Sequence, residues 1–88
     1  MSTVVSVVRR PTLRLNPADD VVVATRPLAA GTLVEAEGVT CLDAIPAGHK
    51  LAVRAVPRGK PVRRYDQIIG FATQDIVPGQ HVHTHNLA

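Results

Sequence analysis

The stretch that decides the fold is Lys50-Leu-Ala-Val-Arg-Ala-Val-Pro-Arg-Gly59. Its first seven residues alternate, with Leu51, Val53 and Ala55 on one face of an extended chain and cationic residues on the other. Its last four residues place Pro and Gly directly after an apolar residue, which is typical of a tight turn. We therefore predict a strand over residues 50–56 that ends in a reversal.

The same turn pattern occurs four times along the chain. Each copy has an apolar residue and, three positions later, a Gly that can adopt the positive φ of a tight reversal. The copies are Leu28-Ala-Ala-Gly31, Ile45-Pro-Ala-Gly48, Val56-Pro-Arg-Gly59 and Ile76-Val-Pro-Gly79. No longer duplicated unit surrounds them, and no long segment free of Pro and Gly has a 3.6-residue apolar period. We predict an all-β domain of short strands.

Three further segments fit this prediction. Asp20-Val-Val-Val-Ala24 is almost entirely apolar, which predicts a strand buried on both faces. Thr12-Leu-Arg-Leu15 alternates in polarity. Residues 67–72 are apolar but contain Gly70, and Gly within a strand commonly marks a bulge or a close approach of another backbone.

Length and composition limit the function classes. The chain has 88 residues, of which 45% are hydrophobic, with one Phe, one Tyr and no Trp. A single domain of this size has a thin core and little room for a deep catalytic cleft. This favours a binding module or an enzyme subunit over a free-standing enzyme.

The cysteine count and the first residues bear on the compartment. Cys41 is the only cysteine, so no internal disulfide can form. The apolar stretch at residues 3–8 is too short for a signal peptide or a membrane span, so we expect a cytoplasmic protein without membrane contact. We interpret residues 1–10 as an extension that adds an edge strand or packs on a partner chain.

The net charge of +3 is concentrated in the segment Arg58-Gly-Lys-Pro-Val-Arg-Arg64. Such a segment attracts carboxylates, phosphates or acidic protein surfaces, or is a solvated loop. Single-stranded nucleic acid is bound through aromatic side chains placed between the charges. Only Tyr65 and Phe71 are available, so we expect no nucleic-acid partner.

Histidines dominate the last residues, His81-Val-His-Thr-His-Asn86. In an extended strand His81, His83 and His85 would lie on one face, where neighbouring imidazoles can bind one metal ion or act as acids and bases. An exposed, frayed terminus is the alternative. His49, in a turn, is more often a surface residue than a ligand.

The order of these motifs resembles the SAF domain of the altronate and galactarate dehydratase family. The resemblance covers residues 19–87 and rests mainly on Gly48-His-Lys50 and on the His81–Asn86 block. Residues 1–18 have no recognised counterpart. We therefore expect an N-terminal extension at residues 1–18 and a SAF domain at residues 19–88. It implies a β-clip fold, with dehydration chemistry in a larger catalytic domain or subunit. The family commonly has Lys-Tyr-Gly where this chain has Arg64-Tyr-Asp66.

The resemblance also implies a function and a site. It suggests the small subunit of a two-chain lyase that dehydrates a sugar acid or related hydroxy acid, with iron or manganese in the assembled enzyme. The implied catalytic residues are His49, His81, His83 and His85, the last three also being candidate metal ligands. The implied substrate contacts are Lys50, Arg64 and Asn86. The alternative hypothesis is a non-catalytic SAF module that binds an anionic ligand or a protein partner.

Overall fold

The computed structural model describes residues 10–88, which form an all-β fold without a helix. The strands are β1 (Thr12–Leu13), β2 (Val21–Ala24), β3 (Leu33–Val34), β4 (Val39–Thr40), β5 (Lys50–Ala52), β6 (Pro61–Arg64), β7 (Gln67–Phe71) and β8 (His81–Val82). The predicted fold class is confirmed. Within this part of the chain, no helix is available that could cross a membrane.

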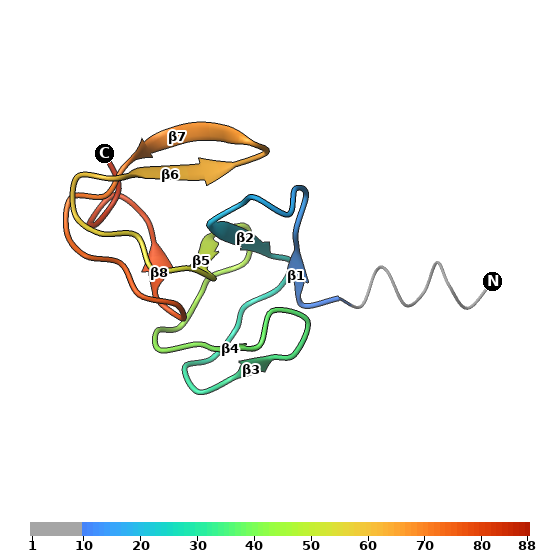
Figure 1. The fold of residues 1–88 in the computed structure, drawn as a ribbon. Helices are drawn as coiled ribbons and strands as arrows, with labels where there is room; N and C mark the ends of the chain where they lie inside the picture. The colour runs from blue at the N-terminus through green and yellow to red at the C-terminus, as the bar shows by residue number, and fades with distance from the viewer. Residues whose placement is uncertain (1–9) are drawn as a thin grey trace.

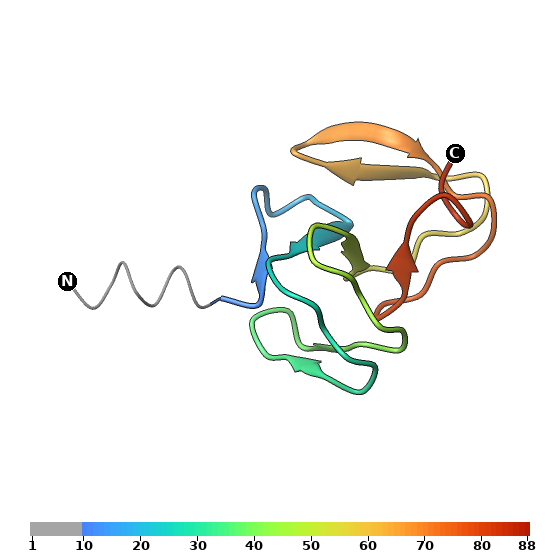
Figure 2. The ribbon, with the colours of Figure 1, turned by 180° about the vertical axis from the view of Figure 1, so that it is seen from behind.

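A central antiparallel sheet has the order β1-β2-β5-β8. The hairpins β3–β4 and β6–β7 form separate two-stranded sheets at opposite ends of the molecule, with the central sheet between them (Figures 1 and 2). β1 lies within the segment 1–18 that was expected to be an extension, and it pairs with β2. The Arg14–Glu37 ion pair, 2.7 Å long, further ties this segment to the residues that link β3 and β4. The folded domain thus extends at least to Thr12, whereas the apolar stretch 3–8 lies outside the described residues.

The four predicted turns are confirmed. Their glycines have φ between 80° and 98°, and their leading apolar residues are all buried. These apolar residues also pair across the fold, since Leu28 and Ile45 exchange two backbone hydrogen bonds of 2.8 Å. Val56 and Ile76 exchange an equivalent pair of 2.8 and 2.9 Å. The four turns therefore form two hydrogen-bonded pairs.

The pairing reveals a duplicated unit that was not found in the sequence. Two buried clusters each contain seven residues. One consists of Val22, Ala24, Leu28, Val34, Cys41, Ile45 and Leu51, and the other of Val21, Ala52, Val56, Val62, Ala72, Ile76 and Val82. Matching backbone hydrogen bonds run from Gly31 to Cys41 and from Gly59 to Ala72, both 2.7 Å, and from Gly48 to Ala24 and from Gly79 to Ala52, both 2.8 Å. The β6–β7 hairpin is the counterpart of β3–β4.

The strand predicted over residues 50–56 is wrong in length and in alternation. β5 ends at Ala52, Leu51 and Ala52 are both buried, and Ala55 is exposed. The physical reason is that β5 lies between the two clusters, so consecutive residues pack on opposite sides. β2 was predicted to be buried on both faces, and its consecutive residues Val21 and Val22 also pack on opposite sides.

Gly70 fulfils both expectations for a Gly within a strand. The register of β6 and β7 shifts between Val62 and Arg63, which leaves Ile69 as the extra residue of a bulge. A Cβ atom at Gly70 would lie 2.5 Å from the carbonyl oxygen of Ala88. The absent side chain therefore lets the C-terminal residues pack against β7.

The adjacent carboxylates Asp19 and Asp20 hold the β6–β7 hairpin in place. Asp19 Oδ1 accepts a hydrogen bond of 3.1 Å from the backbone N–H of Asp66, and Asp20 Oδ2 accepts one of 2.8 Å from that of Arg63. Asp66 and the preceding Tyr65 have φ of 58° and 57°. Asp66 thus adopts the left-handed backbone for which the family commonly has Gly.

Candidate functional site

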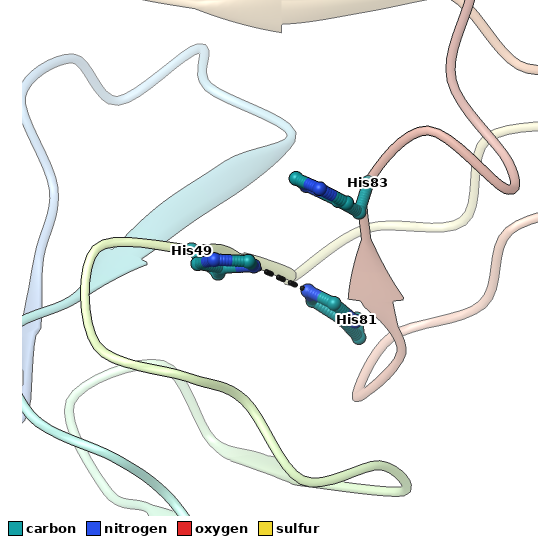
Figure 3. Close-up of side chains that lie close together, drawn as sticks. All are labelled: His49, His81 and His83. Carbon is teal, nitrogen blue, oxygen red and sulfur yellow. Dashed lines mark hydrogen bonds between the residues drawn. The ribbon is translucent and has the colours of Figure 1, made fainter.

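The site begins where β5 pairs with β8. Leu51 lies opposite His81, so their side chains point to the same face of the sheet. His49, two residues before Leu51, brings its ring to this face as well. Its Nδ1 lies 2.9 Å from His81 Nε2, a hydrogen bond in which one ring donates and the other accepts (Figure 3). The accepting nitrogen carries no proton, because its lone pair receives the hydrogen bond.

His83 completes a cluster of three imidazoles. Its ring stacks on that of His49, with centroids 4.6 Å apart, and lies 5.4 Å from that of His81. Figure 3 shows the three rings facing one another, one from the turn before β5 and two from β8 and its end. One nitrogen from each ring lies within 4.8 Å of the others, so these three side chains could hold one ion.

The backbone that carries His83 differs from the prediction. β8 ends at Val82, and residues 83–86 form a turn in which the N–H groups of Asn86 and Leu87 donate to the His83 carbonyl oxygen, at 3.1 and 2.9 Å. The predicted extended strand over residues 81–85 is therefore wrong. His85 lies beside His81, with ring centroids 5.5 Å apart, but it is outside the group that could share an ion. His49, from another element, is in that group.

His81 is the centre of the cluster, because its ring neighbours those of His49, His83 and His85. Burial lowers the pKa of His81 from its ordinary value, repulsion between a protonated His81 and the three surrounding imidazoles lowers it further, and Asp43 opposes the shift. Asp43 Oδ2 also accepts the backbone N–H of His81, at 2.9 Å. The neutral His81 ring offers a lone pair to a metal ion or a proton.

Asn86 fixes the backbone around these rings. Its side chain is only 2% exposed. Oδ1 accepts a hydrogen bond of 2.9 Å from the N–H of His83, and Nδ2 donates one of 2.9 Å to the carbonyl oxygen of His81. Asn commonly closes turns through such local bonds, and this was the signal in the sequence for a turn here. A contact between Asn86 and a substrate stays a prediction.

Lys50 and Arg64 make no hydrogen bond to the imidazoles within residues 10–88. Lys50 alternates with Leu51 along β5 and so points to the other face of the sheet from His81. Arg64 ends β6, where its guanidinium lies 4.4 Å from the centre of the Tyr65 ring and donates to the Tyr65 hydroxyl at 2.8 Å. The structure brings together the four histidines but not these two cations.

The comparison with known families decides the assignment. Residues 10–88 match the family model described as the altronate/galactarate dehydratase SAF domain. The chain belongs to this family. The match starts before residue 19 and so includes β1 in the SAF domain.

Relatives of this SAF domain include long and short proteins. It is 38% identical to altronate dehydratase of Escherichia coli K12 over 76 residues, which are 84% of this chain and 15% of that protein. It is 34% identical over 76 residues to altronate dehydratase of Bacillus subtilis 168, with the same coverage of 84% and 15%. It is also 49% identical over 45 residues to the alpha subunit of (2R)-sulfolactate sulfo-lyase of Chromohalobacter salexigens, which are 51% of this chain and 48% of that subunit. This SAF domain therefore spans about a seventh of the dehydratases and about half of the alpha subunit.

Proposed function

We propose that this SAF domain is the small subunit of a two-chain lyase that removes water from a sugar acid or a related hydroxy acid. Family membership supports the lyase class, and the likeness to a protein named as an alpha subunit supports a separate small chain. In this proposal the catalytic machinery is completed by a larger subunit in the cytoplasm.

The observation that carries the proposal is the convergence of imidazoles at the surface. His49 and His81 are half-buried and His83 is exposed, so the cluster lies at the surface of the domain. Leu42 precedes Asp43, whose carboxylate accepts the backbone N–H of His81, and Leu42 is 57% exposed. A surface cluster with an exposed apolar residue in the adjoining segment is suited to being covered by another protein surface.

The donor set of three imidazoles fits the divalent iron that the family implies better than manganese, which prefers oxygen ligands. Metal–nitrogen bonds of about 2.1 Å place two ligands of one ion no more than about 4.2 Å apart, which the present spread of up to 4.8 Å reaches by small ring rotations. We assign His49, His81 and His83 as the residues that would hold the ion. When bound, it would stabilise the negative charge that develops next to the substrate carboxylate.

The remaining chemistry falls to groups that move protons. Removing water from a hydroxy acid requires a base for the proton next to the carboxylate and an acid for the departing hydroxyl. His85 is exposed, lies beside His81 and is not needed as a ligand, so its imidazole is the one left to exchange protons with the substrate. The other proton-transferring group then comes from the larger subunit.

The test is to purify this chain from its native cells and identify any bound protein by mass spectrometry. We expect a larger lyase chain, dehydratase activity of the complex on a hydroxy-acid panel, and no activity of this chain alone with metal supplied. Turnover by the isolated domain would overturn the two-chain proposal. A complex that keeps full kcat with His49→Ala, His83→Ala and His85→Ala would overturn the contribution of this cluster and leave a non-catalytic binding module.

A further inference from the structure

The β6–β7 hairpin exposes an unusual set of apolar side chains. Tyr65 is 50% exposed, Ile68 48% and Phe71 51%, and Ile69 between them is also exposed. They include the only Tyr and the only Phe of the chain. The counterpart hairpin β3–β4 exposes only Leu33 among the apolar residues of its strands. Because the two hairpins are equivalent in the duplicated fold, this apolar face is not a requirement of the architecture.

The tip of this hairpin holds Tyr65 in a backbone conformation that a Tyr disfavours. Two successive residues with positive φ form the kind of two-residue turn in which Asn and Gly are usual. A Tyr in the left-handed region costs about 1–2 kcal/mol relative to Gly. The cost is tolerated because Asp19 anchors Asp66 and Arg64 stacks on the ring of Tyr65. The tip therefore exposes an aromatic side chain that these contacts position.

Charge selects the kind of partner. Residues 58–71 contain four cationic residues and one carboxylate, so their formal charge of +3 equals the net charge of the whole chain. Two copies joined through this face would oppose two such charges. A base stack on Tyr65 would meet a ring that Arg64 already covers on one side, and Ile68 and Ile69 add apolar surface that nucleic acid does not use. An acidic protein surface satisfies both the charge and the apolar side chains.

We propose that Tyr65, Ile68, Ile69 and Phe71 form a docking face for a partner protein that offers an apolar pocket surrounded by carboxylates. Such aromatic and aliphatic anchors beside Arg are typical of the side chains that dominate binding energy. The identity of the partner as the larger lyase subunit rests on the proposed function, whereas the docking face itself does not.

The first experiment locates the contact in native cell extract. Two photo-crosslinking variants, Ile68→p-benzoylphenylalanine and Leu33→p-benzoylphenylalanine, place the same probe on the two equivalent hairpins. We expect a protein crosslinked from position 68 and not from position 33. If that protein is a lyase chain, the docking face and the identity of its partner both gain support. If it is another protein, the lyase subunit does not occupy this face, the two-chain proposal is decided by the purification test, and the docking face depends on the affinity measurement below. No specific crosslink from position 68 would overturn the docking face.

The second experiment measures affinity with the purified crosslinked protein. Ile68→Asp should weaken binding at least about 30-fold, the equivalent of a central contact worth about 2 kcal/mol. Leu33→Asp, an equally exposed change on the counterpart hairpin, should stay within about threefold. Thermal melts of both variants control for folding. Equal affinities of Ile68→Asp and the unchanged chain would overturn the docking face and would leave the proposal for the histidine site unaffected.

The same variants distinguish a protein partner from a second copy of the chain and from a nucleic acid. Sedimentation of the isolated chain should show a monomer, and a dimer abolished by Ile68→Asp would instead identify a second copy as the occupant. A labelled dT20 oligonucleotide should not bind. Binding that is lost in Ile68→Asp would identify a nucleic-acid surface and overturn the protein partner.

Discussion

Replacing Asn86 by Ala separates a structural role from a substrate contact. The side chain is buried and both of its polar atoms are used, by the N–H of His83 and by the carbonyl oxygen of His81. Asn86→Ala removes both hydrogen bonds at once. If the residue serves the fold, the domain loses stability with no substrate or partner present.

The magnitude follows from these two bonds. Each contributes about 1 kcal/mol net, and the backbone groups left without a partner inside the turn add a penalty, so we expect a loss of about 2–3 kcal/mol. For a domain of this size each kcal/mol lowers the melting temperature by about 4–8 °C, which predicts a drop of about 10–20 °C. Loosening of the turn should also scatter the imidazoles and, under the proposed metal assignment, weaken metal binding by the isolated chain.

Urea and thermal unfolding of the isolated domain provide the assay. His85→Ala is the matched control, because it changes an exposed side chain one position earlier and should stay within about 0.5 kcal/mol of the unchanged domain. If Asn86→Ala is as stable as this control, the two hydrogen bonds do not support the fold, and the role of Asn86 as a substrate contact becomes the better explanation.

Three other changes test neighbouring features. Val82→Asp should leave the isolated domain unfolded because it buries a charge in a core cluster. His83→Ala should melt normally and lower kcat of the proposed two-chain enzyme at least about 10²-fold, because it removes a ligand of the proposed ion. The opposite pattern in thermal melts would contradict the burial of Val82 and the exposure of His83. An Ala in the left-handed conformation costs about 1–2 kcal/mol. Gly79→Ala should lower the free energy of unfolding by more than this, because its Cβ would collide with the carbonyl oxygen at the end of β4. Gly48→Ala, which has open space around it, should lower the free energy of unfolding in urea by only about that amount. In metal-free buffer, His81 binds a proton less readily in the folded chain than in the unfolded chain, so the free energy of unfolding should fall as pH drops below 6.5. The His81→Asn variant corrects for the other groups that titrate. Equal urea midpoints at about pH 7.5 and about pH 5.5 after this correction would contradict the prediction.

Local chemistry made the turns predictable. Each turn has a Gly three residues after an apolar residue, with Pro between them in three of the four copies, and Gly31, Gly48, Gly59 and Gly79 all take the positive φ that the pattern indicated. Gly70 was equally informative, because a missing side chain within an apolar strand indicates a close neighbour regardless of what that neighbour is. These features depend on a few adjacent residues.

The duplication could not be read from the sequence. Equivalent core positions are identical in places, as Ala24 and Ala52 or Ile45 and Ile76 are, but differ in others, as Cys41 and Ala72 do. The spacing also differs, because β6 and β7 have four and five residues where β3 and β4 have two each. Backbone hydrogen bonds retain a symmetry that the side chains share only in part.

The candidate site was predicted in part. The histidines were found from their density, but alternation along a strand was the wrong reason, since Asn86 pulls the chain into a turn after Val82. The residues around His49 predicted an ordinary surface residue, because a single His in a turn does not indicate a functional site. Its place beside His81 follows from the pairing of β5 with β8, a contact distant in sequence.

The two-sided burial of the central strands has a consequence for how the chain finds its pairing. β2 offers Val21 to one cluster and Val22 and Ala24 to the other. A slip of β2 by one residue in one direction would keep Val at the first two positions but put Thr25 in the space of Ala24, and a slip in the other direction would bury Asp20. β5 offers Leu51 and Ala52, which differ in volume, so a slip in one direction would force Leu into the space of an Ala. A slip in the other direction would put Ala in the space of Leu and leave a cavity of the kind that costs about 2–5 kcal/mol. Both central strands thus carry information that prevents misalignment. Leu51→Val together with Ala52→Val would remove the contribution of β5 and leave that of β2.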